Sequence, residues 1–197
     1  MTSPSSPLLL LASASPRRSA LLAQIGLPHR VHATEVDESP LPAEAPESLV
    51  ARLALAKTRA GVAAAGGLPV LGADTIVVLD GRVLNKPRDA AEAAEMLMSL
   101  GGRTHAVLSA VALQDAGGAI RTALASSRVT LRAIAPVEAL RYWDSGEPRD
   151  KAGGYAIQGY GAVFIRELTG SYSGVMGLPL FETAALLREA GISWTRA

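Results

Sequence analysis

The sequence has 197 residues and a formal net charge of +1, and its length suits one domain with a full hydrophobic core. Hydrophobic residues make up 49% of the chain and charged residues 19%, so we expect a globular protein rather than a disordered one. The near-zero charge gives no sign of a nucleic-acid partner. The absence of cysteine excludes disulfides, thiolate catalysis and cysteine-ligated metal sites.

The first predicted element is a buried strand over Leu8–Ala12, which is a short and continuous apolar run. This run is shorter than the roughly 7–15 residues of a signal-peptide core, and no basic residue precedes it. No segment approaches the roughly 20 apolar residues of a membrane span. We therefore expect a cytoplasmic chain without a membrane partner.

The segments that follow carry helix-start signals, glycine stops and a two-residue turn. Ser15 as N-cap with Pro16 is typical of a helix N-terminus, and Asp80-Gly81 is typical of a type I′ hairpin turn. In chain order the sequence predicts a helix from Pro16 to about Gly26, a turn flanked by His29 and His32, a loop over Thr34–Pro46, a helix over about Glu47–Ala65, hairpin strands at Val70–Leu79 and Arg82–Leu84, a helix capped by Asp89 and ending at Leu100, paired strands at His105–Leu113 and about Ala119–Ala133, a helix at Pro136–Trp143, a polar loop at Asp144–Gly161, a strand at Ala162–Ile165 and a helix at Pro179–Ala190.

Helices and strands alternate along the chain, but at least two of the connections are hairpins. This pattern predicts an α/β fold with a mixed, partly antiparallel central sheet flanked by helices, rather than a strictly parallel sheet. No internal repeat or linker interrupts the pattern, so we expect a single domain over residues 1–197.

The segment Ser13-Ala14-Ser15-Pro16-Arg17-Arg18 joins the first strand to a helix N-terminus. Free backbone N–H groups and the positive end of the helix dipole meet there, and two hydroxyls and two guanidinium groups would complete a phosphate cradle. Ordinary helix capping with two solvated arginines explains the same six residues about equally well.

Asp74 lies in Gly72-Ala73-Asp74-Thr75, inside a strand of Val, Leu and Ile. A carboxylate in such a run is costly unless it is paired, protonated or bound to a metal, which makes Asp74 a candidate general base or cation ligand. An aspartate at an exposed bend, or one satisfied by backbone N–H groups, is the alternative.

Only three of the 19 basic residues are lysines, namely Lys57, Lys86 and Lys151. This bias toward arginine suggests that these three positions require a compact ammonium group. Drift in base composition would give the same count. Lys151 lies in the glycine-rich polar loop together with Gln158, whose amide offers both a donor and an acceptor to a base edge. Glu38 belongs to an acidic loop, which near a phosphate site would imply a divalent cation and otherwise is simply solvated.

Taken in order, these segments resemble the Maf family of nucleotide pyrophosphatases along nearly the whole chain. The matching segments are Ser13–Arg18, Asp37-Glu38, Leu55-Ala56-Lys57, Gly72–Val78, Lys86-Pro87, Thr104-His105, Gly146–Gly159, Gly170-Ser171-Tyr172 and Gly177-Leu178-Pro179. The runs Leu71–Val77, Asp150–Tyr155 and Ile157–Gly159 are most similar to the dTTP/UTP branch of the family. The run Ser173–Met176 departs from the bulkier or more polar residues of many relatives.

The resemblance implies an ITPase-like fold with a cleft, and hydrolysis of dTTP and UTP to the nucleoside monophosphate and pyrophosphate with a divalent cation such as Mg, Mn or Co. It implies that the chain forms a homodimer. It also implies that the small molecule bound by the protein is a nucleoside triphosphate. By position it makes Asp74 the proton acceptor. The other implied roles are substrate specificity for Arg17, Thr75 and Gln158, phosphate binding for Ser13, Ser15, Arg17, Arg18, Lys57, Lys86 and Lys151, and metal binding for Glu38 and Asp74.

Two other functions fit parts of the sequence. A non-catalytic nucleotide-binding regulator of cell division would use the same residues, although a base and a metal set exceed what binding needs. A nucleic-acid binder would use Arg17 and Arg18 on a phosphate backbone, which the near-zero net charge disfavours.

Overall fold

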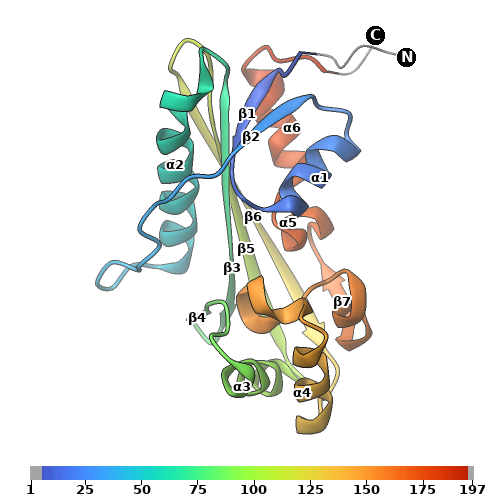
Figure 1. Cartoon of the computed structure of the whole chain (residues 1–197). Coiled ribbons are helices and arrows are strands. Elements are labelled where there is room, and N and C mark those ends of the chain that lie inside the picture. Colours follow the sequence, from blue (N-terminus) through green and yellow to red (C-terminus); the bar gives the residue numbers. More distant parts are fainter. Residues whose placement is uncertain (1–5, 195–197) are drawn as a thin grey trace. The chain divides into compact units, whose positions relative to one another are not determined.

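The structure is a computed structural model that describes residues 6–194 (Figure 1). Because the apolar run at the N-terminus is continuous, its strand is buried on both faces, as the sequence predicts. The elements in order are β1 (Leu9–Ala12), α1 (Pro16–Gln24), β2 (His29–His32), α2 (Pro46–Ala65), β3 (Val70–Leu79), β4 (Arg82–Leu84), α3 (Ala90–Leu100), β5 (Thr104–Gln114), β6 (Ile120–Leu131), α4 (Pro136–Asp144), the 3-10 helices η1 (Glu147–Asp150), η2 (Ala152–Gly154) and η3 (Gly159–Phe164), β7 (Ile165–Thr169), α5 (Tyr172–Met176) and α6 (Leu180–Glu189).

Seven strands of the described chain form one mixed sheet in the order β2-β1-β3-β5-β6-β7, with β4 paired to β3. β1 runs parallel to β2 and β3, whereas β4 is antiparallel to β3 and β7 is antiparallel to β6. The sheet confirms the predicted α/β class with a mixed, partly antiparallel sheet. The register pairs Leu11 with Leu71, so the carboxyl end of β1 lies beside the segment of β3 that contains Asp74.

The chain divides into two compact units, and the division falls within β3, β5 and β6. The first unit contains the residues up to Asp74, Ser109–Leu124 and the residues from Gly177 onward, and the second contains Thr75–Leu108 and Ala125–Met176. The expectation of one domain over residues 1–197 remains a prediction.

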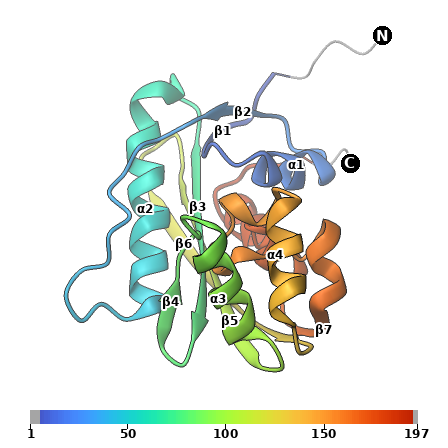
Figure 2. The same cartoon turned by 60° about the horizontal axis from the view of Figure 1, so that its bottom comes forward.

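In the first unit, α2 lies along β1 and the first half of β3 (Figures 1 and 2). Two glycines allow this close approach. A Cβ on Gly61 would lie 2.9 Å from the Cβ of Ala12, and one on Gly72 would lie 2.6 Å from the backbone nitrogen of Thr58. The buried leucines of β1 and β3 fill the space that remains, so α2 has a fixed position on the sheet.

In the second unit, α3 and α4 lie side by side (Figure 2). Their apolar faces join one core cluster with the strands and the loop after α4: Val77, Leu79, Ala94, Leu97, Leu100, Val107, Val129, Leu131, Ala139, Tyr142, Tyr155 and Phe164. The predicted Asp80-Gly81 turn is confirmed, since both residues have positive φ as a type I′ turn requires.

Two local predictions were wrong. His29–His32 is the edge strand β2 and not a turn, because pairing with β1 satisfies its backbone although its side chains are largely exposed. The segment predicted as a strand at Ala162–Ile165 belongs mainly to η3, and the strand β7 starts at Ile165. The predicted N-cap position of Ser15 at the start of α1 is confirmed, although its side chain makes no capping hydrogen bond.

Among the described residues, no helix is both long enough and apolar enough to cross a membrane.

Candidate active site

The candidate site of the first unit begins where β1 ends, at Ser13. The Ser13 side chain is buried, and its Oγ accepts hydrogen bonds from the backbone N–H of Ser15 at 3.1 Å and from the Arg18 guanidinium at 3.1 Å. Ser13 therefore supplies the hydroxyl that organises the start of α1, a role that the sequence assigns to Ser15.

Arg18 is tied to the protein at two points of its guanidinium group. Besides Ser13, its Nε donates to the carbonyl of Gly177 at 2.8 Å. Burial lowers the pKa of Arg18, the negative charges of Asp74 and Glu38 oppose this shift, and the positive charge of Arg17 adds to it. Arg18 thus lies within the electrostatic reach of the other charged residues of the candidate site.

Asp74 lies on β3 with only 7% of its surface exposed, and Lys57 on α2 is 8% exposed. The Lys57 Nζ donates to the Asp74 Oδ1 at 2.7 Å. This ion pair offsets the cost of placing a carboxylate in an apolar strand. The predicted pairing of a buried Asp74 with a neighbouring cation is present.

Lys57 reaches Asp74 because its helix is held close to the strand. Thr58 is fully buried, and its hydroxyl lies 3.0 Å from the carbonyl of Ala54 and 3.0 Å from the carbonyl of Ala112 on β5. Gly72 leaves the room for Thr58, because a Cβ at that position would lie 2.5 Å from the Thr58 Oγ1.

Glu38 brings a second carboxylate to the same ammonium group. Its Oε1 lies 2.6 Å from the Lys57 Nζ, and its side chain is 51% exposed. The loop around Glu38 is fastened to α2 by Arg52, which donates to the carbonyl of Ser39 at 2.9 Å and forms a two-point ion pair with Glu44 at 2.6 and 2.7 Å. A two-point Arg–carboxylate pair fixes direction as well as distance.

Two carboxylates that converge on one cation are a suitable donor set for a divalent metal ion. Glu38 and Asp74 each place an oxygen within 2.7 Å of the Lys57 Nζ. Mg²⁺ is commonly held by one or two carboxylates together with substrate phosphates and water. Within residues 6–194, no group of three or more His, Asp or Glu side chains is arranged to hold a metal by itself. The two residues therefore fit a metal that the substrate helps to bind.

Four of the predicted site residues belong to the second unit: Thr75, Lys86, Lys151 and Gln158. Thr75 follows Asp74 on β3, and Lys86 is exposed just after β4. The Lys151 Nζ donates to the carbonyl of Glu147 at 2.6 Å and to Asp150 at 2.7 Å, and Gln158 is exposed at the start of η3. The structure brings the residues of the first unit together, and a shared site with these four remains a prediction.

Sequence reasoning did not single out Arg52 and Thr58. Arg52 was indistinguishable from any arginine on a helix surface. Thr58 had a weak signal, since Gly72 inside a strand often marks a close approach of another segment.

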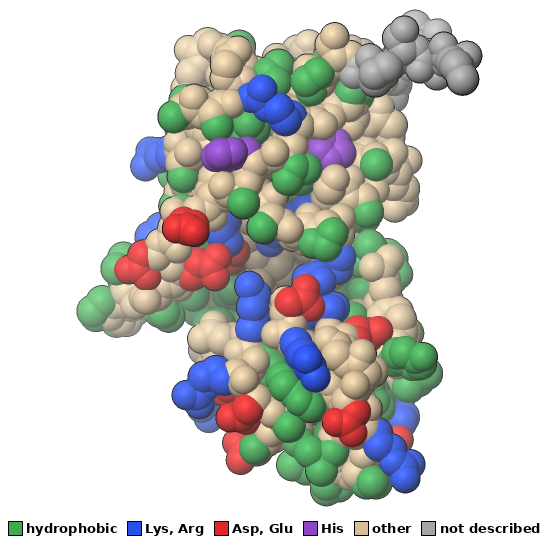
Figure 3. Space-filling model, viewed as in Figure 1, with side chains coloured by type: hydrophobic (Ala, Val, Ile, Leu, Met, Phe, Trp, Pro, Cys, Tyr) green, Lys and Arg blue, Asp and Glu red, His purple; other side chains and the backbone are tan. Residues whose placement is uncertain are grey.

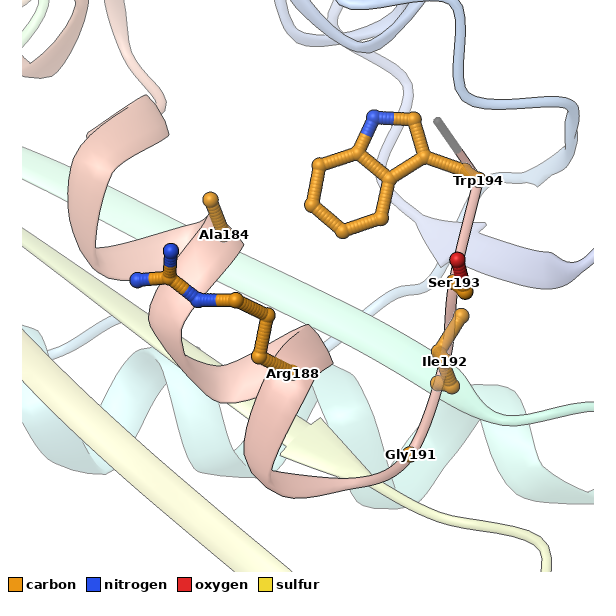
Figure 4. Close-up of a pocket in the computed structure, with 6 residues that line it drawn as sticks. All are labelled: Ala184, Arg188, Gly191, Ile192, Ser193 and Trp194. Carbon is orange, nitrogen blue, oxygen red and sulfur yellow. The ribbon is translucent and has the colours of Figure 1, made fainter. Parts of the chain in front are cut away.

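A separate pocket of about 470 Å³ lies in the first unit, between α6 and the segment that follows it (Figure 4). It is lined by Ala184, Arg188, Gly191, Ile192, Ser193 and Trp194. The indole N–H of Trp194 donates to the carbonyl of Ile25 at 2.9 Å, which fixes the ring as one wall. None of the predicted site residues lines this pocket.

Figure 3 shows acidic side chains grouped at the left of the view, over the loop that precedes α2, and basic and acidic side chains mixed in the lower part of the view.

The chain is similar to known proteins over nearly its whole length. The model of the family described as Maf-like protein matches residues 8–190. A dTTP/UTP pyrophosphatase of Alkalilimnicola ehrlichii is 52% identical over 196 residues, which cover 96% of each chain. One of Methylococcus capsulatus is 53% identical over 189 residues, covering 95% of this chain and 93% of the relative. A solved structure of a nucleoside-triphosphatase / dITP/XTP pyrophosphatase from Mycobacterium abscessus has 20% identity and a TM-score of 0.44, and covers 93% of this chain and 95% of its own.

Proposed function

The chain belongs to the Maf-like protein family, and on this basis we propose that it hydrolyses dTTP and UTP to the nucleoside monophosphate and pyrophosphate. Relatives that carry the name dTTP/UTP pyrophosphatase share 52% and 53% of its residues over nearly the full length. A role in nucleotide binding alone would not need a carboxylate beside the phosphate-binding cations.

The observation that carries the proposal is the buried Asp74 carboxylate and its ion pair with Lys57 at 2.7 Å. Asp74 would accept a proton from a water molecule as the water oxygen attacks the α-phosphorus. The bond from this phosphorus to the bridging oxygen breaks, and pyrophosphate leaves. In the structure Lys57 contacts the Asp74 carboxylate and so holds it in a defined position for this role.

The phosphates would be bound by the positive groups around the start of α1. Arg17, Arg18 and Lys57 supply charge, and Ser13 together with the first N–H groups of the helix supplies hydrogen-bond donors. Phosphoryl transfer needs charge neutralisation and positioning more than covalent chemistry. Ser15, Lys86 and Lys151 complete the proposed phosphate-binding set.

We propose that Glu38 and Asp74 hold a divalent cation, one of Mg²⁺, Mn²⁺ or Co²⁺, together with the phosphates. When bound, such an ion supplies positive charge to the phosphate oxygens and helps to orient the substrate. Lys57 would then turn from the carboxylates toward the phosphates, since all of these groups would lie within reach of its flexible side chain.

We propose that Arg17, Thr75 and Gln158 set the preference for thymidine and uridine nucleotides. The Gln158 amide can donate to and accept from the edge of a pyrimidine base. A panel of nucleoside triphosphates, assayed for pyrophosphate release with each of the three metals, measures this preference directly.

The critical test is Asp74→Asn. The amide keeps the size of the side chain but cannot take the proton, so we expect kcat for pyrophosphate release from dTTP to fall by about 10²- to 10⁴-fold. Circular dichroism and thermal unfolding should show a folded protein. Asp80→Asn is the matched control, because Asp80 lies in the hairpin turn at positive φ, which asparagine tolerates.

Turnover of Asp74→Asn at the wild-type rate would rule out Asp74 as the base. A wild-type protein that binds dTTP but releases no pyrophosphate with any of the three metals would instead favour a non-catalytic nucleotide-binding role.

We also propose that the protein acts as a homodimer in the cytoplasm, as the family resemblance implies. Size-exclusion chromatography with light scattering measures the oligomeric state.

A further inference from the structure

The carboxylate of Glu147, at the start of η1, is held by three hydrogen-bond donors, and Lys151 lies within electrostatic reach of it. Its Oε1 accepts from the Tyr142 hydroxyl at 2.6 Å and from the Gly161 N–H at 2.9 Å. Its Oε2 accepts from the Tyr160 N–H at 2.9 Å. Glu147 therefore fastens the backbone on the C-terminal side of Gln158.

The same network reaches the N-terminal side of Gln158 through Tyr142. The Tyr142 hydroxyl donates to Glu147 and accepts from the backbone N–H of Ala156 at 3.0 Å. Tyr142 itself is buried on α4, so it connects the loop to the core of the second unit. The three residues from Ile157 to Gly159 are thus held at both ends, and Gln158 is at their centre.

Two glycines make this arrangement possible. A Cβ on Gly159 would lie 2.1 Å from the Glu147 Oε2, and one on Gly161 would lie 2.6 Å from the Tyr142 hydroxyl. Gly159 also has a φ of +73°, which residues with a side chain rarely adopt. The two glycines near Gln158 therefore make room for the Glu147 carboxylate and the Tyr142 hydroxyl, and do not only provide flexibility.

The charge states of Glu147 and Tyr142 keep these hydrogen bonds intact at neutral pH. Burial alone would raise the pKa of Glu147, but the hydrogen bonds from Tyr142, Gly161 and Tyr160 outweigh it, so this pKa lies below its usual value. Burial and the neighbouring Glu147 raise the pKa of Tyr142, which therefore stays protonated. Glu147 is thus an acceptor and Tyr142 a donor throughout the neutral range.

We propose that Glu147 is a positioning residue that, with Tyr142, fixes the loop of Gln158 and thereby sets the discrimination between nucleotide bases. The inference rests on the proposed function, in which the Gln158 amide reads the base. A recognition group held in one place binds its ligand without first losing conformational entropy. Loosening the loop should therefore weaken selective binding and leave the chemical step at Asp74 intact.

The test uses Glu147→Gln and Tyr142→Phe. The amide of glutamine has only one acceptor oxygen, whereas donors face both oxygens of Glu147, so either amide orientation opposes its NH₂ to another donor. For Glu147→Gln we expect the ratio of the kcat/KM values for dTTP and dCTP to fall about tenfold. The change should appear in KM, while kcat stays nearly unchanged. Tyr142→Phe should act in the same direction, because it disconnects Ala156.

Glu138→Gln is the matched control. Glu138 also accepts at both oxygens in the second unit, from Arg132 and from the backbone N–H of Ala135, but it holds the start of α4 and not the loop. It should leave the nucleotide ratio at the wild-type value even if it lowers the melting temperature.

The decisive measurement is the double variant Glu147→Gln/Gln158→Ala. If Glu147 acts through Gln158, its effect on the nucleotide ratio disappears once Gln158 is truncated. A wild-type ratio in folded Glu147→Gln, or an equal effect with and without Gln158, would overturn the inference. Dissociation constants of the α,β-imido analogues of dTTP and dCTP give the same ratio without turnover. A failure of hydrolysis in the wild type would therefore count against the proposed function and not against this inference.

Discussion

Asp74 in the first unit and Glu147 in the second are both carboxylates with a defined position, but they are stabilised in different ways. Asp74 has a charged partner, the ammonium of Lys57, within a nearly buried pair. Glu147 has neutral partners, the hydroxyl of Tyr142 and two backbone N–H groups. Asp74 is stabilised by a cation that contacts it, whereas Glu147 is stabilised mainly by fixed dipoles, with a smaller contribution from the charge of Lys151.

The difference separates a reactive group from a structural one. An ion pair can be exchanged, since a metal ion or a phosphate can take over one of its members when substrate binds. A carboxylate surrounded by backbone N–H groups has no partner to exchange without unfolding the loop. We therefore expect variants around Asp74 to change catalysis and stability together, and variants of Glu147 and its donors to change stability or selectivity alone.

The largest effect should come from Lys57→Met, which leaves the Asp74 carboxylate buried without its cation. Removing one partner of a buried ion pair costs about 3 kcal/mol of unfolding free energy. The double variant Lys57→Met/Asp74→Asn should recover most of this loss, because it removes the isolated charge as well. Urea unfolding measures both values, and a steady-state assay should show that both variants are inactive.

Arg103→Met is the control for this prediction. Arg103 pairs with Asp80 at 2.7 Å, but the two side chains are 47% and 66% exposed, so the loss should be much smaller. An equal loss for Arg103 and Lys57 would mean that burial of the Asp74 pair carries no special cost, and the contrast between the two carboxylates would fail.

The next effect concerns a neutral pair of the second unit, His105 and Tyr155. Their Nε2 and hydroxyl oxygen are 2.6 Å apart, and burial lowers the pKa of His105 from 6.5 to about 4. Between these pH values His105 is protonated in the unfolded chain but neutral in the folded chain. Folding stability therefore falls as the pH drops from 6.5 to about 4. The loss of folding stability between these two pH values should amount to about 3 kcal/mol. Above pH 6.5 His105 is neutral in both states, so this loss is absent there.

His105→Gln keeps a partner for Tyr155 but does not titrate. Between pH 7 and pH 4, the unfolding free energy of the wild type should therefore fall more than that of this variant. His32→Gln is the control, because His32 is exposed on β2 and is solvated in both states. A difference that does not change with pH would show that His105 is not kept neutral by burial.

Much of the fold could be predicted from local signals. The run at β1, the turn Asp80-Gly81 and the caps around Asp89 each depend on residues close together in the sequence. β2 could not be predicted in this way. Its four residues, His-Arg-Val-His, are mostly polar, and they form a strand only through pairing with β1. Segments whose structure is decided by a distant partner carry no local signal.

The candidate site shows the same division. Asp74 stood out because a charge inside an apolar strand needs a partner, and that partner is Lys57. Thr58 and Glu147 did not stand out, since a threonine on a helix and a glutamate in a polar loop are unremarkable in sequence. Their roles depend on which atoms surround them in space, such as the carbonyl of Ala112 for Thr58.

The smallest predicted effect tests whether the charge pair needs a fixed helix. Thr58→Val removes the hydroxyl that links α2 to Ala112, so we expect a loss of about 1 kcal/mol of unfolding free energy. Because Lys57 precedes Thr58 on the same helix, kcat for dTTP should also fall a few-fold. Thr183→Val is the matched control, since Thr183 is equally buried and donates to the carbonyl of Pro179 at 2.8 Å, but lies on α6. A similar loss of stability with unchanged kcat in both variants would show that the Asp74–Lys57 pair tolerates movement of α2.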